Sequence, residues 1–202
     1  MESLALSVIT ITTITGTMLH LRRTGGRFRF PIATLVLAAV TALISVVGDV
    51  NPEVLDHLGR NRSLLVAGQW WRLVTPLFVQ DGIWLGTLFN ISALIIIGLC
   101  TESLHRRSMF LIVYFVAGLV SEVFAYTLLP GQGFAGNSVA NMGAAGLCLV
   151  SLYASKAIPV RIIGVVGVVA GVALIATANL HGVGFAVGSL AGLAVVQARR
   201  RA

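Results

Sequence analysis

The chain has 202 residues, of which 57% are hydrophobic and only 10% are charged, and its net charge is +7. A soluble domain carries about 25% charged residues, so this composition excludes a soluble globular protein and indicates an integral membrane protein. The positive charge does not indicate nucleic-acid binding, because the basic residues flank apolar segments, where they anchor the topology and contact lipid headgroups.

The first apolar segment, Leu4–Leu21, contains five threonines and lacks the basic start and the cleavage site of a signal peptide. We expect an additional helix here, which either spans the membrane or lies on its surface. Four arginines follow it before the next apolar segment. We therefore treat residues 1–29 as an extra helix with a basic connection, and residues 30–202 as the membrane domain.

Six further segments are long and apolar enough to cross a bilayer as helices, which takes about 20 residues. In chain order they are Phe30–Gly48, Ile83–Thr101, Met109–Leu129, Gly136–Ser155, Pro159–Thr177 and Leu180–Ala198. The predicted fold class is all-α, a polytopic bundle of six helices with the extra helix before it. The only long connection, Asp49–Gly82, has an apolar part, Leu73–Val79, which we expect to lie partly in the membrane interface.

Basic residues are confined almost entirely to alternate connections between these spans. Eleven of the 14 Lys and Arg residues fall on one side of the membrane, and the other three lie in the long connection. The positive-inside rule places the basic side, including the C-terminus, in the cytoplasm. The fourth and sixth spans then begin at the outer side.

Small residues recur along the fourth and sixth spans. Gly184, Gly188 and Gly192 form one helical stripe on the sixth, and Gly143 and Gly146 lie on the fourth. Helices in lipid associate where small residues allow their backbones to approach closely. The pattern predicts that these two spans pack tightly together.

Ser138 and His181 lie at the starts of the same two spans, so we expect their side chains at the same depth. Lipid offers neither of them a hydrogen-bond partner. A neutral imidazole that accepts a hydrogen bond from the serine satisfies both groups and makes the serine a latent nucleophile. No Asp or Glu follows Glu122, which argues for a dyad rather than a triad. The alternative is a purely structural Ser–His bond.

Five short motifs occur in a consistent order between Gln69 and Gly192. They are Trp71-Arg72, Phe89-Asn90, Gly98 with Glu102, Gly136-Asn137-Ser138 with Gly143, and His181 with Gly184 and Gly188. Each motif is weak alone. Their conjunction in a six-helix membrane protein resembles the rhomboid family of intramembrane serine proteases.

The resemblance implies an endopeptidase, in a bacterial plasma membrane, that cleaves single-span membrane proteins near the outer face. It implies that Ser138 attacks the scissile carbonyl, that His181 takes the proton, and that Asn90 and the Ser138 N–H bind the oxyanion. Structural or gating roles fall to Trp71, Arg72, Glu102, Gly136, Gly184 and Gly188. No cofactor or metal is expected.

Two positions depart from the family pattern. Gly86 stands four residues before Asn90, where the family usually has a histidine, and Val139 replaces the usual glycine after the nucleophile. Loss of one oxyanion donor costs about 10²–10³ in rate. The alternative function is therefore a catalytically weak or inactive rhomboid-like protein that binds and guides transmembrane segments.

Glu122 lies within the third span, where a charge is costly and often functional. It is the only support for a third function, a small transporter. We favour a structural role, in which Glu122 hydrogen-bonds Tyr126 one helical turn further on.

Overall fold

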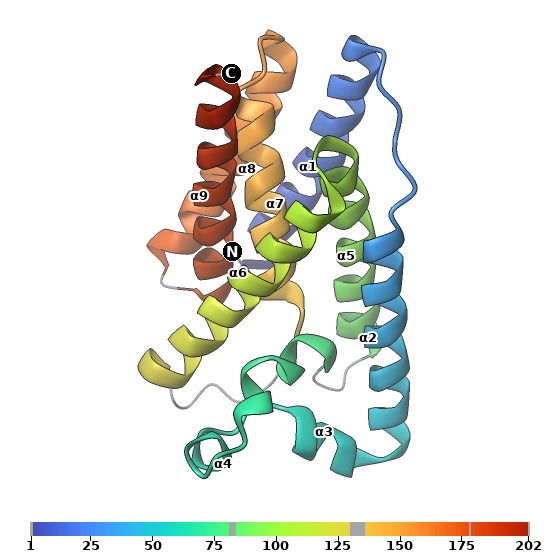
Figure 1. Ribbon diagram of the computed structural model, residues 1–202, viewed down its shortest axis with the longest axis vertical. Helices are drawn as coiled ribbons and strands as arrows, with labels where there is room; N and C mark the ends of the chain where they lie inside the picture. Colours follow the sequence, from blue (N-terminus) through green and yellow to red (C-terminus); the bar gives the residue numbers. More distant parts are fainter. Residues whose placement is uncertain (1, 81–83, 130–135, 178, 202) are drawn as a thin grey trace.

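A computed structural model describes residues 2–80, 84–129, 136–177 and 179–201, and all regular structure in these ranges is helical (Figure 1). The 3₁₀ helices are written η. The elements are α1 Glu2–Thr24, α2 Ile32–Val50, α3 Pro52–Leu58, α4 Arg62–Val66, η1 Trp70–Leu73, η2 Thr75–Phe78, α5 Trp84–Leu104, α6 Arg107–Leu128, α7 Ser138–Tyr153, α8 Ile158–Ala176 and α9 Leu180–Arg201.

Six of the described helices are long and apolar enough to cross a membrane, namely α1, α2, α5, α6, α8 and α9. The predicted all-α, multi-pass architecture is confirmed, and helix ends move by only a few residues from the predicted ones. Ile83, the predicted start of the second span, lies outside the described residues.

The fourth predicted span is shorter than expected. It forms α7, which has 16 residues instead of the 20 between Gly136 and Ser155. All but three residues of α7 are buried, and the helix packs against α1, α5, α6, α8 and α9. Because neighbouring helices surround it on all sides, α7 does not need the full length of a lipid-facing span.

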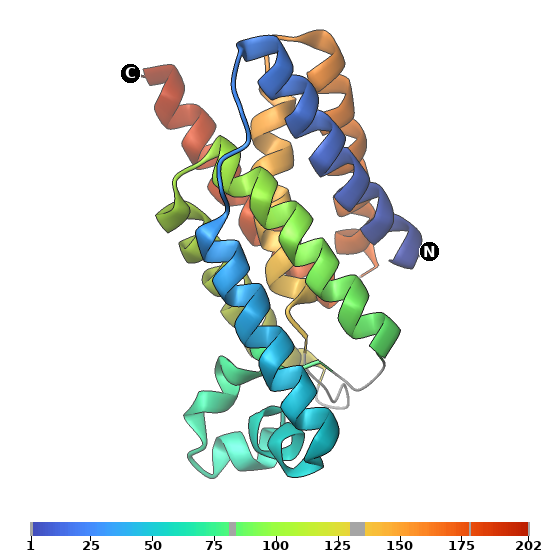
Figure 2. The ribbon, with the colours of Figure 1, turned by 90° about the vertical axis from the view of Figure 1, so that its right-hand side faces the viewer.

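α1 lies within the bundle, where it packs against α5, α7 and α8 (Figure 2). Its 23 residues are long and apolar enough to span a membrane. The threonines are tolerated because their hydroxyls donate to carbonyls of the preceding turn. Thr10, Thr13 and Thr15 make such bonds at 2.7–2.9 Å. The hydroxyls are therefore satisfied inside the helix.

The predicted close approach of the fourth and sixth spans is confirmed at α7 and α9. A Cβ on Gly188 would overlap the carbonyl oxygen of Gly143, and one on Gly184 would overlap the carbonyl oxygen of Val139. Only glycine fits at these two positions with the backbones so close. The same contact brings the first turns of both helices side by side.

The long connection forms α3, α4, η1 and η2, which gather at one end of the bundle (Figure 1). Its apolar part is buried in the protein: Leu77 is 1% exposed and lies against Gly118 of α6. Whether this connection lies partly in the membrane interface stays a prediction. The two tryptophans Trp70 and Trp71 do remain exposed.

Glu122 has a different partner from the one predicted. Its two carboxylate oxygens accept hydrogen bonds from Arg60 Nε and Nη2, at 2.8 and 2.6 Å, while Tyr126 donates to the carbonyl of Arg72. Glu122 is fully buried and Arg60 is 9% exposed. The pair ties the long connection to α6, which is in keeping with the structural role expected of Glu122.

Candidate active site

Ser138 is the first residue of α7 and His181 is the second residue of α9. Ser138 Oγ lies 2.9 Å from His181 Nε2, although 43 residues separate them in the sequence. The two helix starts can meet because the glycines of α9 let it lie directly against α7. A serine hydroxyl is thus within hydrogen-bonding distance of an imidazole nitrogen inside a membrane bundle.

The other ring nitrogen of His181 faces two oxygens. Asn179 Oδ1 lies 2.8 Å from Nδ1 and also accepts the backbone N–H of His181, and Glu2 Oε1 lies 2.9 Å from Nδ1. An oxygen of either kind can only accept from Nδ1, so the ring proton belongs there. Nε2 is then the nitrogen with a lone pair, and it faces the serine hydroxyl.

Glu2 was missed by the sequence analysis, which considered only acidic residues near His181 in the chain. The topology carried a usable signal. The basic end of α1 lies with the other basic connections, so its first residue must lie at the end of the bundle where α9 begins. The acidic residue in the first turn of α1, Glu2, could therefore have been predicted to lie near the start of α9.

Asn90 belongs to a chain of amides beside Ser138. Asn90 Nδ2 donates to Gln80 Oε1 at 2.7 Å, and Gln80 Nε2 donates to Asn137 Oδ1 at 3.2 Å. Gln80 is 2% exposed. The carbonyl of Asn90 accepts from Asn141 of α7, which fixes α5 against α7 at this level. Gln80 is thus the central member of this chain of amides.

Gly136 lies where these polar groups converge. A Cβ at this position would lie 3.6 Å from Ser138 Oγ, 3.7 Å from Gln80 Oε1 and 3.9 Å from Asn90 Nδ2. A larger residue would fill the space between the three groups. Glycine here keeps that space open for a small polar group such as a carbonyl oxygen.

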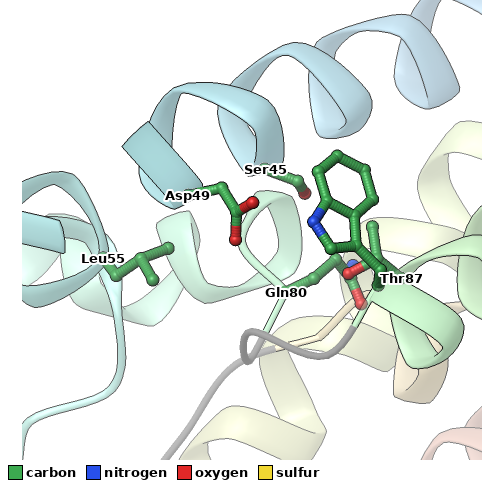
Figure 3. A pocket seen from close by; sticks show the side chains of 6 residues that line it. Ser45, Asp49, Leu55, Gln80 and Thr87 are labelled. Carbon is green, nitrogen blue, oxygen red and sulfur yellow. The ribbon is translucent and has the colours of Figure 1, made fainter. Parts of the chain in front are cut away.

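On its other side Gln80 borders a small pocket with Ser45, Asp49, Leu55, Trp84 and Thr87 (Figure 3). Its volume is about 10 Å³. That is close to the minimum that one water molecule requires, so this pocket does not accommodate a substrate.

The pocket at Ser138 is much larger, about 410 Å³. It is lined by Ser3, Leu6 and Ser7 of α1, Phe89 and Asn90 of α5, and Ser138 and His181. This volume is within the range of about 300–1,000 Å³ that is typical of ligand sites. The extra helix therefore forms one wall of the site.

The two departures from the family pattern have different surroundings. Gly86 is exposed, lies one turn before Asn90, and would have no heavy atom within 4 Å of an added Cβ. Val139 is 5% exposed and lies in the core, as does Met142. Position 86 has room for a larger side chain, whereas position 139 is filled.

Trp71 and Arg72, two of the residues given structural or gating roles, do not line the Ser138 pocket. Arg72 is 2% exposed and donates to Gln69 Oε1 and to the carbonyls of Asp56 and Gly59, at 2.5–2.8 Å. These bonds hold η1 against α3. Trp71 donates to the carbonyl of His57 and is 49% exposed.

Glu102 links α5 to α2 at the opposite end of the bundle. Its Oε1 accepts from the backbone N–H and the hydroxyl of Thr34, at 2.8 and 2.7 Å, and its Oε2 lies 3.2 Å from Arg107 Nε. Gly98 makes room for the same threonine. The pair Gly98 and Glu102 thus joins two helices through one residue.

No group of three or more His, Cys, Asp or Glu residues that could hold a metal ion is found in the described part of the chain. Cys100 and Cys148 are buried free thiols.

Comparison with known proteins assigns the family. The rhomboid domain family matches residues 67–199, which include α5 to α8, nearly all of α9, and both Ser138 and His181. The chain belongs to the rhomboid family. Together with its six candidate spans, this makes it a multi-pass membrane protein.

Three rhomboid relatives are similar over part of their length. Rhomboid protease GluP of Bacillus subtilis (strain 168) is 32% identical over 144 residues, which are 71% of this chain and 27% of the relative. Rhomboid-like protease 2 of Toxoplasma gondii is 35% identical over 104 residues, 50% of this chain and 36% of the relative. Rhomboid-like protease 3 of the same organism is 27% identical over 116 residues, 57% of this chain and 44% of the relative. The matched part of the chain therefore spans less than half of each relative.

Proposed function

We propose that the chain is an intramembrane serine endopeptidase that cleaves single-span membrane proteins near the outer face of a bacterial plasma membrane. The observation that carries this is the 2.9 Å distance between Ser138 Oγ and His181 Nε2, which both line a pocket among membrane helices. The rhomboid relatives are named as proteases, which supports the same activity.

The reaction follows from this geometry. Ser138 Oγ attacks the scissile carbonyl carbon while His181 Nε2 takes its proton, and the imidazolium then returns the proton to the leaving amine. Water attacks the resulting acyl-enzyme with His181 again as the base. The substrate must be extended at the cut, because a helical carbonyl is already hydrogen-bonded within its own helix.

The oxyanion has two donors nearby. Ser138 is the first residue of α7, so its backbone N–H has no carbonyl partner within its own helix. Asn90 contributes its side-chain amide, held in orientation by Gln80. The Asn90 amide borders the space kept open by Gly136, where it would meet the oxyanion.

The charge distribution supports the proposed orientation. Arg199 and Arg107 lie at one end of the bundle, where they hydrogen-bond the carbonyls of Leu104 and Phe30. This end also carries Arg22 and Arg23 of α1. By the positive-inside rule it faces the cytoplasm, together with the C-terminus, and the Ser138 pocket opens at the outer side.

The decisive experiment uses a serine-directed fluorophosphonate on the purified protein in lipid. Wild type is expected to be labelled and to cleave a single-span test substrate, whereas Ser138→Ala should do neither. Ser45→Ala is the matched control, because the Ser45 hydroxyl donates to Thr41 within α2. Equal labelling of wild type and Ser138→Ala would rule the mechanism out.

A second candidate is a rhomboid-like protein that binds and guides transmembrane segments without cutting them efficiently. Gly86 favours it, because the helix turn above Asn90 presents no side-chain donor to the site. In that case Ser138→Ala would still bind the test substrate as wild type does, and cleavage would be undetectable in both.

A further inference from the structure

An acidic residue of α1, Glu2, contacts the candidate site, although Ser138 and His181 belong to other helices. Glu2 Oε1 lies 2.9 Å from His181 Nδ1. The Glu2 side chain is 48% exposed and that of His181 is 18% exposed, so the contact lies at the mouth of the pocket. Ser3, Leu6 and Ser7 hold this first turn of α1 against the same pocket.

Asn179 and Glu2 both face Nδ1, but they differ in charge. Asn179 Oδ1 also accepts the His181 backbone N–H, which is the bond of a helix cap, so its position is set by the start of α9. It is suited to orient the ring. Only Glu2 can supply a negative charge, and a negative charge matters most when the ring becomes positive.

We propose that Glu2 is a positioning residue that stabilises the imidazolium of His181, so that the site is a Ser138–His181–Glu2 triad with its third member on the first helix. This rests on the proposed proteolytic function. As Oγ bonds to the carbonyl carbon, the carbonyl π pair moves to oxygen and the Oγ proton moves to Nε2. The proton leaves on the amine when the C–N bond breaks, and Glu2 gains none.

The expected size follows from the distance and the exposure. Two opposite unit charges about 3 Å apart attract each other even at the dielectric constant of water. If this attraction is present only in the transition state, it corresponds to a rate increase of roughly tenfold. The half-exposed carboxylate justifies the use of that dielectric constant. Removal of the charge should therefore slow acylation about tenfold and move the acid limb of the pH–rate profile about one unit lower.

The test compares Glu2→Gln with Asn179→Ala and with Glu53→Gln, the same substitution in the exposed helix α3. The readout is the rate of fluorophosphonate labelling from pH 4 to 9. Glu2→Gln should be labelled more slowly than wild type at pH values above the acid limb, and at nearly the wild-type rate below it. The limb itself should lie at lower pH. Asn179→Ala should be slower with the limb unmoved, and Glu53→Gln should match wild type.

Two further measurements guard against a folding defect. Glu2→Asp keeps the charge and should recover part of the rate, and high salt should slow wild type toward Glu2→Gln because the carboxylate is half exposed. A Glu2→Gln profile that superimposes on wild type, or that is slower at every pH with an unmoved limb, overturns the proposal. Labelling that persists in Ser138→Ala is a separate result, since it refutes the proteolytic function itself.

Discussion

The side-chain amide of Asn90 serves two partners at once. One of its two hydrogens is donated to Gln80 Oε1, and the second is the one that the proposed mechanism assigns to the oxyanion. Gln80 is itself held by Asn137, the residue before the nucleophile. The orientation of one oxyanion donor is therefore coupled to the start of α7, which explains why a buried glutamine lies at this place.

Position 86 offers a direct gain-of-function prediction. Gly86→His places a donor one turn above Asn90, in space that holds no other atom within 4 Å of the new Cβ. Because one oxyanion donor is worth about 10²–10³ in rate, we expect kcat for the test substrate to rise at least about tenfold. The measurement is cleavage by purified protein in lipid.

The control for this change is Gly86→Leu, which adds similar bulk without a donor and should leave kcat near the wild-type value. Equal rates for all three proteins would mean that Gln80 or water already supplies the missing donor. Val139→Gly is a poorer comparison, because Val139 is buried and its loss would also open a cavity.

At the scale of the elements, the contact between α7 and α9 sets the distance between Ser138 Oγ and His181 Nε2. Gly184 and Gly188 have no room for a side chain, since backbone carbonyls of α7 occupy it. Ser138 and His181 lie on these same helices, one or two turns away. Any separation of the helices therefore separates the hydroxyl from the imidazole.

Gly188→Ala tests whether the Ser138–His181 distance depends on the close contact between α7 and α9. The added methyl would overlap the Gly143 carbonyl, so the helices must move apart, at a cost of about 1–3 kcal/mol in stability. Cleavage and labelling should both fall well below wild type. Thermal unfolding in detergent and labelling rate are measured together.

Ala194→Val is the matched variant, because Ala194 is exposed on the same helix and has no such neighbour to displace. Ala194→Val should change neither the thermal stability nor the labelling rate appreciably. Wild-type stability and labelling in Gly188→Ala would show that α9 can shift without disturbing the site.

At the scale of the whole molecule, hydrophobic runs and charge alternation were enough to predict the helices, because lipid penalises any other arrangement. The Ser138 and His181 pairing was also accessible, since both residues begin spans from the same side. The contacts of Glu2, Gln80 and Arg60 were not, because they depend on how distant elements rotate and dock. The length of α7 was missed because the small uncharged residues that flank it, Gly136, Asn137, Ala154 and Ser155, do not mark its ends.

α1 runs from the N-terminus, near mid-height in Figure 1, toward the basic end of the bundle, where α9 finishes. A membrane-impermeant maleimide should thus label a cysteine in a tag fused before residue 1 in intact cells, but label Arg201→Cys only after permeabilisation. Glu53→Cys in α3 is the outer-side positive control. The native Cys100 and Cys148 are buried, so the background should be low. Labelling of Arg201→Cys in intact cells would reverse the orientation.

The shortness of α7 has a consequence for hydrolysis. Sixteen residues rise about 24 Å, some 6 Å less than a hydrocarbon thickness of about 30 Å. If the cytoplasmic end of α7 lies at one boundary of the hydrocarbon layer, Ser138 lies beneath the other. In the proposed reaction, each turnover consumes a water molecule at Ser138. The 410 Å³ above the serine has room for roughly a dozen, at about 30 Å³ apiece. Because α7 is short, the pocket at its start offers space for water beside the peptide bond that the proposed reaction hydrolyses.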